Sequence, residues 1–158
     1  MKLYKSLLQV FERIRLLEKY DALSKKYQAT ERMLKYSNVE IIILLRNLGC
    51  SSNFVSQENL FRVEGLYKKC RLRLNISLKN GEVGLAIYVL DLKDDELIQG
   101  GSFASICKRI ERERNQRREG YIPSPTFGNY AELKGILEEG LEIFKEFRME
   151  MMSIETVF

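Results

Sequence analysis

The chain has 158 residues, of which 45% are hydrophobic and 30% charged, and its formal net charge is +4. A chain of this length can bury a core without metal or disulfide support, so a single domain over residues 1–158 is expected. Its N-terminal segment lacks the unbroken apolar core of a signal peptide, and no apolar run is long enough to span a bilayer. The composition excludes a disordered chain and predicts neither secretion nor membrane binding.

Histidine is absent, and the three cysteines are widely spaced. Because histidine is the usual general base, nucleophile activator and transition-metal ligand, its absence excludes Ser-His-Asp triads, Cys-His dyads and histidine zinc sites. Neither a Walker A nor a dinucleotide-binding glycine motif is present. We therefore expect no catalytic residue, no cofactor and no metal, and the unpaired thiols indicate the reducing cytoplasm.

The N-terminal half begins with a helical stripe of apolar residues that runs from Leu3 to Leu17 and reaches Leu23. We expect this helix to break near Asp21. Residues 37–49 have the cap residues of a short helix, which we favour, although the run 41–43 is also typical of a strand. Residues 51–56 are predicted as a loop, and residues 57–65 as a short helical turn.

The strongest local pattern is a β-hairpin between about Leu66 and Leu92. Apolar and polar residues alternate from Cys70 to Leu78, and the alternation resumes from Val83. Between them Asn80-Gly81 supplies the two positive φ angles that a type I′ turn needs. The first strand carries arginines on its polar face and is predicted nearer a sheet edge, whereas the second is apolar on both faces and is predicted to be covered on both.

The C-terminal half is predicted as turn, helix, loop and helix. Ser102 is placed to cap a helix that runs to about Arg118, whose polar second half should project into solvent. Residues 120–128 form a loop, and Asn129 with Glu132 resembles a capping box that starts a last amphipathic helix. The fold class is α+β, with an antiparallel hairpin or small sheet packed against the N- and C-terminal amphipathic helices.

Three surface features are candidates for binding a protein partner: an acidic loop, a basic helix and an apolar loop with two prolines. Their candidate partner-binding residues are Asp94, Asp95, Glu96, Arg109, Arg112, Arg117, Tyr121 and Phe127. Each has a structural alternative, namely a solvated turn, a salt-bridged helix face and a loop that packs back on the domain. Nucleic acid is a further possible partner of the arginines, but interleaved glutamates halve their net charge.

One arrangement of carboxylates permits catalysis. Asp91-Leu92-Lys93 at a strand end matches the acid-x-Lys element of restriction-type nucleases, with Glu64 as the further acid that a metal site requires. The pattern recurs at Glu132-Leu133-Lys134 inside a predicted helix, so it is weakly specific. A metal-dependent nuclease is therefore an alternative to a binding protein.

The segment 125–133 reads Pro-Thr-Phe-Gly-Asn-Tyr-Ala-Glu-Leu and leads into the last helix. This entry, together with a helix-flanked hairpin that lacks catalytic residues, resembles bacterial immunity proteins of polymorphic and contact-dependent toxin systems. The resemblance implies a cytoplasmic protein that neutralises a cognate protein toxin by occluding it. It assigns no individual binding residue, because such proteins meet their toxins through variable surface loops. The net charge of +4 departs from the acidic character of many immunity proteins to nucleases.

Overall fold

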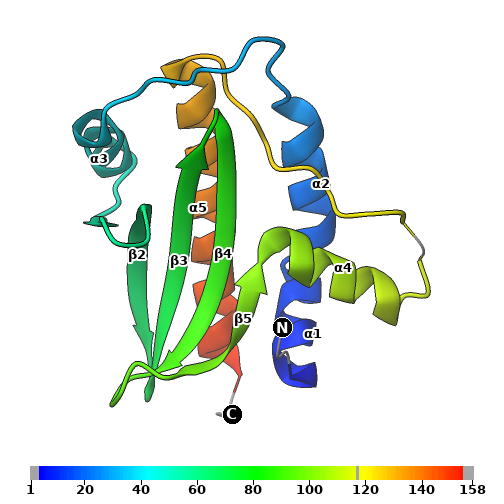
Figure 1. Ribbon diagram of the computed structural model, residues 1–158. Helices are drawn as coiled ribbons and strands as arrows, with labels where there is room; N and C mark the ends of the chain where they lie inside the picture. Colours follow the sequence, from blue (N-terminus) through cyan, green and yellow to red (C-terminus); the bar gives the residue numbers. More distant parts are fainter. Residues whose placement is uncertain (1–3, 117, 155–158) are drawn as a thin grey trace.

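The computed structural model describes residues 4–116 and 118–154 and has an α+β fold (Figure 1). A five-stranded antiparallel sheet packs its apolar face against helices from both ends of the chain. The elements are α1 (Lys5–Arg13), α2 (Leu16–Lys26), α3 (Asn38–Asn47), β1 (Asn53–Val55), β2 (Leu60–Tyr67), β3 (Cys70–Lys79), β4 (Glu82–Asp91), β5 (Leu97–Ser102), α4 (Phe103–Glu113) and α5 (Tyr130–Ser153). No helix within the described ranges is long and apolar enough to cross a membrane.

The predicted hairpin is confirmed as β3 and β4. Asn80 has a φ of 53° and Gly81 a φ of 75°, which are the two left-handed conformations of the predicted turn. The strands pair from Lys79↔Glu82 to Cys70↔Asp91 without interruption. The turn therefore fixes a ten-residue register, and that register decides which side chains of β3 and β4 share a face.

The position of β3 in the sheet differs from the prediction. The strand order is β1-β2-β3-β4-β5, so β3 is the central strand and not near an edge. Its apolar residues, such as Leu72 and Leu74, are buried against the helices, whereas Arg71 and Arg73 lie half-buried on the opposite face. Apolar and polar residues alternate along β3 because helices cover one face of the sheet and leave the other free. For the same reason β4 is covered on one face only.

Residues 57–65 do not form the predicted helical turn. The chain turns at residues 56–59 and enters β2, where Phe61 and Val63 face the core. Gly65 stands at the next inward position and has no apolar side chain, so the alternation that indicates a strand covers only a few residues of the sequence. The predicted loop 51–56 likewise contains β1, which extends the sheet beyond β2.

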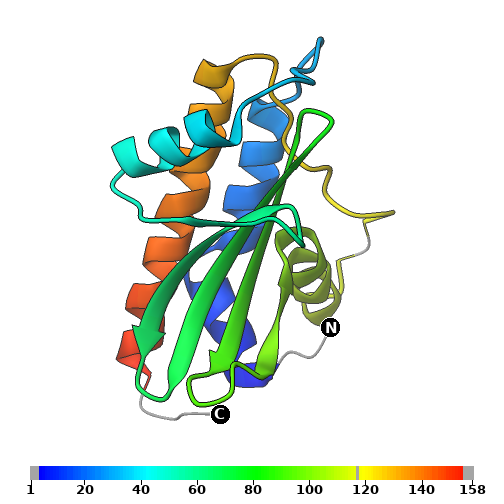
Figure 2. The same cartoon turned by 60° about the vertical axis from the view of Figure 1, so that its left-hand side comes forward.

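Helices α1, α2 and α5 form a layer behind the sheet, seen in Figure 2 beyond the strands. The N-terminal helix breaks at Arg15, which has a φ of 59°, rather than near Asp21. The helix prediction for residues 37–49 is confirmed by α3. Strand β5 occupies the end of the segment before Ser102 that is predicted as a turn, and α4 ends at Glu113, earlier than predicted.

The N-caps predicted for α4 and α5 are present, whereas α3 begins after Ser37 without a side-chain cap. The Ser102 hydroxyl accepts a hydrogen bond from the Ser105 N–H at 3.1 Å. At the start of α5, the Asn129 side chain accepts from the Glu132 N–H at 2.8 Å, and the Glu132 carboxylate accepts from the Gly128 N–H at 2.7 Å. The entry segment 125–129 is thereby held to the first turn of the longest helix.

Replacing Asn129 by alanine is expected to lower the free energy of unfolding by about 1 kcal/mol, because the first turn of α5 loses a side-chain acceptor. Urea denaturation measures the change. Lys134→Ala, at an exposed position one turn further along α5, is the control and should change stability by less than about 0.5 kcal/mol. Equal losses in the two variants would contradict the capping role.

Candidate functional site

One face of the sheet carries no helix and faces the viewer in Figure 2. Strand alternation places on it the residues between the buried positions of β2, β3 and β4. We call this surface the open sheet face. It comprises Arg62, Glu64, Leu66, Arg71, Arg73, Asn75, Ser77, Gly84, Ala86 and Tyr88.

A network of ion pairs orders the charges of the open sheet face. Glu64 lies opposite Arg73 in the β2–β3 register, and its Oε2 is 3.3 Å from Arg73 Nη2 and 3.3 Å from Arg71 Nη1. Arg71 Nε lies 3.1 Å from Asp95 Oδ1 in the β4–β5 turn. The Arg73 side chain is only 13% exposed, so most of it is removed from solvent. The network presents charged groups in fixed positions.

Arg62 forms a second, separate group of contacts on the open sheet face. Its Nη2 is 2.9 Å from Glu58 Oε2, and its Nε donates to Asn75 Oδ1 at 3.4 Å. The three arginines of the open sheet face are thus matched by three carboxylates, those of Glu58, Glu64 and Asp95. A balanced surface of this kind suits a protein partner with its own mixed charges better than the uniformly negative backbone of a nucleic acid.

Next to these charged residues, the open sheet face carries small and apolar side chains. Gly84 and Ala86 of β4 leave the sheet almost flat, and Tyr88 is half-buried on the same face. Leu66 on β2 is 64% exposed. Tyrosine and arginine are among the residue types enriched at the centres of protein interfaces.

The predicted acidic loop is the turn between β4 and β5. The Asp94 side chain accepts from the Glu96 N–H at 3.0 Å, which stabilises the turn, and Asp94 and Glu96 are exposed. Asp95 differs because it pairs with Arg71 and so joins the open sheet face. Of the predicted partner-binding acids, Asp95 is therefore the one that belongs to the larger surface.

The predicted residues of the basic helix and the apolar loop lie elsewhere. Arg109 is exposed and paired with Glu113 at 3.2 Å, and Arg112 is exposed without an ion pair to any described residue. Arg117 lies outside the described residues. Tyr121 is 61% exposed, whereas Phe127 is fully buried in the core, as expected if the loop packs back on the domain. Figure 1 places α4 and the β4–β5 turn apart, so these candidates form no common surface.

The polar end of α4 is exposed, as predicted, but its arginines are paired with other parts of the domain. Arg114 pairs with Glu18 at 2.8 Å, and Arg118 pairs with Asp21 at 3.1 Å and with the buried Glu111 at 3.3 Å. These contacts join the segment after α4 to α2. The basic residues that the sequence presents as a free cluster are largely neutralised within the domain.

The carboxylates of Glu18 and Asp21, which pair with the segment after α4, are expected to make the stability of the fold depend on pH. Desolvation opposes ionisation of Glu18, but hydrogen bonding to Arg114 prevails and lowers its pKa below 4.5. Hydrogen bonding to Lys25, with the charge of Arg118, lowers the pKa of Asp21 below 3.8. A lowered pKa in the folded state gives stability that is present above these values and lost as the pH falls through the lowered ones.

We therefore expect the midpoint of urea unfolding to fall between pH 5 and pH 2, and to fall less steeply in the double variant Glu18→Gln, Asp21→Asn. The double variant should be less stable than the wild type near neutral pH and closer to it at pH 2. Parallel pH profiles for the two proteins would show that these carboxylates do not contribute.

The nuclease alternative lacks an assembled site. Asp91 lies on β4 and Glu64 on β2, so the whole of β3 separates the two strands. Their partners on β3, Cys70 and Arg73, are three positions apart. The Asp91 carboxylate accepts from the Lys93 N–H at 2.8 Å, as a turn residue does, and Glu64 is occupied by two arginines. No group of three His, Cys, Asp or Glu side chains within residues 4–116 and 118–154 is placed to hold a metal ion.

The thiols are placed as structural residues. Burial, with the nearby carboxylates of Glu111 and Glu18, raises the pKa of Cys107 to about 12. Burial also raises the pKa of Cys70 and of the half-buried Cys50. Because the thiolate is the nucleophile, a raised pKa makes each of them less reactive.

At pH 8 a thiol with a pKa of about 12 is ionised to roughly one part in 10⁴. We expect a chromogenic disulfide reagent to modify Cys50 slowly in the native protein and Cys107 only after unfolding in urea, where all three thiols should react. Rapid native modification of Cys107, read by mass spectrometry of peptides, would contradict the structural role.

Comparison with protein families, with curated proteins and with solved structures finds no match to this chain.

Proposed function

We propose that this chain is a non-catalytic, cytoplasmic binding protein of the immunity-protein kind, which neutralises a cognate protein toxin by covering it with the open sheet face. The observation that carries the proposal is a sheet face free of helices whose charged side chains are ordered by ion pairs. Free thiols at Cys50, Cys70 and Cys107 are consistent with a reducing compartment.

Binding would use the rigidity of this surface. Its side chains come from paired strands, and Arg71 and Arg73 are already held by Glu64, so little conformational entropy is lost when a partner docks. Tyr88 and Leu66 would supply apolar contact area. The surrounding charges would set partner choice and association rate.

A nucleic acid has less support as the partner. The three arginines of the open sheet face are balanced by three carboxylates, and the arginines after α4 pair with α2. A phosphate backbone requires an excess of positive charge along its path. Neither region of the described structure offers such an excess.

The test combines partner capture with a growth assay. The tagged chain is purified from its native host after nuclease treatment, and the protein that it retains is produced alone and together with the chain. We expect the recovered partner to stop growth when produced alone and to be harmless when the chain is present. A gene for such a protein next to the gene of this chain would identify the candidate directly. Retention of nucleic acid alone, or a partner whose toxicity the chain does not relieve, would overturn the proposal.

A further inference from the structure

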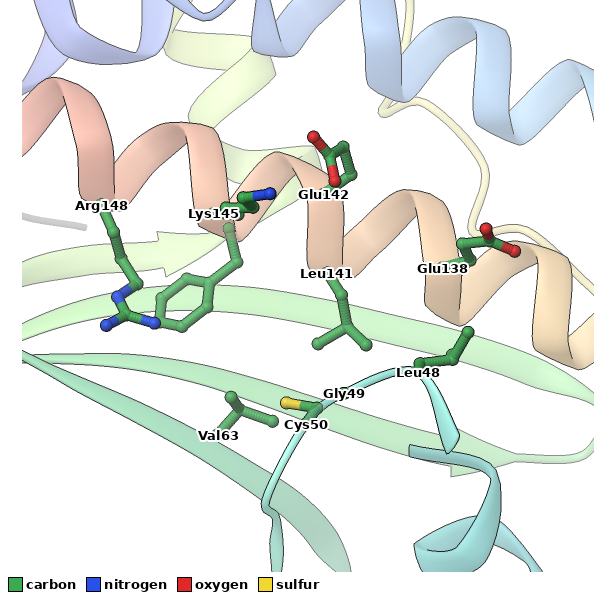
Figure 3. A pocket seen from close by; sticks show the side chains of 10 residues that line it. Leu48, Gly49, Cys50, Val63, Glu138, Leu141, Glu142, Lys145 and Arg148 are labelled. Atoms are coloured by element: carbon green, nitrogen blue, oxygen red, sulfur yellow. The ribbon is translucent and has the colours of Figure 1, made fainter. Parts of the chain in front are cut away.

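A pocket of about 420 Å³ lies on the helix side of the sheet, apart from the open sheet face. It is enclosed by the segment between α3 and β1, by β2, and by one side of α5 (Figure 3). Its volume is in the range of pockets that hold small molecules. Its lining residues are Leu48, Gly49, Cys50, Val63, Glu138, Leu141, Glu142, Phe144, Lys145 and Arg148.

The inner part of this pocket is apolar. Leu48 and Leu141 approach each other across it, and Val63 of β2 lies beneath them in Figure 3. The Phe144 ring is buried at the same site. Such a lining favours an aliphatic or aromatic group over a polar one.

Arg148 brings a positive charge to one end of the pocket. Its guanidinium carbon is 5.8 Å from the centre of the Phe144 ring, so the side chain lies along the apolar wall. It makes no hydrogen bond or ion pair to any residue that the structure describes. The guanidinium therefore has its donors available to a ligand, unlike Arg71 or Arg73 on the open sheet face.

Gly65 makes the position of Arg148 possible. It lies on the helix-facing side of β2, and a Cβ added there would be 2.7 Å from Arg148 Cζ. The guanidinium thus occupies the space that any larger residue at position 65 would fill. An alanine at this position would displace the end of the arginine side chain without changing the backbone.

The carboxylates that line the pocket do not neutralise this end. In Figure 3 the Glu142 carboxylate points away from Cys50 and Val63, and Glu138 lies at the far end of the pocket from Arg148. In Figure 3 Lys145, one turn before Arg148 on α5, likewise does not point toward Cys50 or Val63. The Arg148 guanidinium, which reaches β2 at Gly65, is therefore the charged group that faces the inner wall.

We propose that this pocket binds a small monocarboxylate with a short aliphatic or aromatic body, with the carboxylate on the Arg148 guanidinium and the apolar body between Leu141 and Val63. The guanidinium fork matches a carboxylate in geometry and charge. The site is independent of the open sheet face, so it stands whether or not the proposed toxin partner is found.

The test is titration of the isotope-labelled full chain with three probes of equal length, octanoate, octanol and octylamine, followed by amide NMR. Octanoate should shift signals of residues 48–50, β2 and the middle of α5, and should bind at least about tenfold more tightly than octanol, because charge-assisted hydrogen bonds have no counterpart in the alcohol. Octylamine should bind most weakly. Absence of binding by octanoate, or equal binding of octanol, would overturn the proposal.

Variants test whether the carboxylate of octanoate binds to Arg148. Arg148→Gln and Gly65→Ala should each weaken octanoate about tenfold or more while leaving octanol nearly unchanged. Arg112→Gln, which removes an exposed arginine of α4 far from the pocket, is the matched control for net charge and should have no effect. Unchanged octanoate affinity in Arg148→Gln, or equal losses in Arg112→Gln, would overturn the assignment. The folded signal dispersion of each variant shows that loss of binding is not loss of structure.

Discussion

Replacing Phe147 by alanine is expected to lower the free energy of unfolding by about 3–5 kcal/mol, the largest stability effect of any substitution considered for this chain. Phe147 is fully buried in α5. Its ring stacks on Phe11 of α1 at a centroid distance of 5.1 Å and lies 6.4 Å from Phe144. The alanine variant therefore loses contacts that join α1 to α5, the helices from the two ends of the chain.

Urea denaturation at neutral pH measures this effect. Met152→Ala is the control on the same helix, because Met152 is 72% exposed and its truncation should change stability by less than about 0.5 kcal/mol. If Phe147→Ala does not fold, Phe147→Leu should fold and lose about 1–2 kcal/mol. A loss below about 1 kcal/mol in Phe147→Ala would show that α1 and α5 do not pack through these rings.

Exchanging the charges of one ion pair on the open sheet face is expected to abolish most of the binding to the proposed partner. The double variant Glu64→Arg, Arg73→Glu keeps the net charge and an acid opposite a base in the β2–β3 register, but reverses the pattern that a partner meets. We expect the affinity to fall by at least about 30-fold, as for a hot-spot residue, with the fold retained. Calorimetry with the purified partner gives the affinity.

Two further exchanges serve as controls for this variant. Arg109→Glu with Glu113→Arg inverts an exposed pair on α4, where the sequence also predicts partner binding, and Lys26→Glu with Glu139→Lys inverts a pair between α2 and α5. Both should bind the partner normally. Loss of binding in the α4 exchange, with normal binding in the sheet exchange, would move the interface to the basic helix.

The parts of the fold that the sequence predicts are those fixed by neighbouring residues. Asn80-Gly81 with alternation on both sides predicts β3 and β4, and Asn129 with Glu132 predicts the start of α5. Turn and cap chemistry acts over a few residues, and so it can be read locally. The hairpin also supplies the central strand of the sheet, which the local pattern does not reveal.

The elements that the sequence misses depend on distant contacts. The apolar alternation of β2 is broken at Gly65, where the Arg148 side chain fills the space that a larger residue would need. Arg148 lies 83 positions later in the chain, so the local sequence does not show this contact. The helix break at Arg15 has no glycine or proline to mark it. Likewise, the sequence does not reveal the partners of Arg114 and Arg118, because Glu18 and Asp21 lie on α2, far away along the chain.

The sequence shows part of the candidate surface. Arg71 and Arg73 mark the polar side of a strand, which predicts a position near an edge, whereas in the structure this polar side belongs to the open face of the central strand. Asp95 is the predicted partner-binding residue that belongs to this face. The matching alternation of Arg62 and Glu64 in β2 is the signal that would have revealed a second strand of the same surface.

Side-chain oxidation footprinting of the complex tests the central claim most directly, because it reports which face the partner covers. Leu66 is 64% exposed and Tyr88 half-buried on the open sheet face, while Tyr121 is 61% exposed beside α4. We predict that the partner reduces oxidation of Leu66 and Tyr88 and leaves Tyr121 unchanged. Protection of Tyr121, with unchanged oxidation of Leu66 and Tyr88, would contradict binding through the open sheet face.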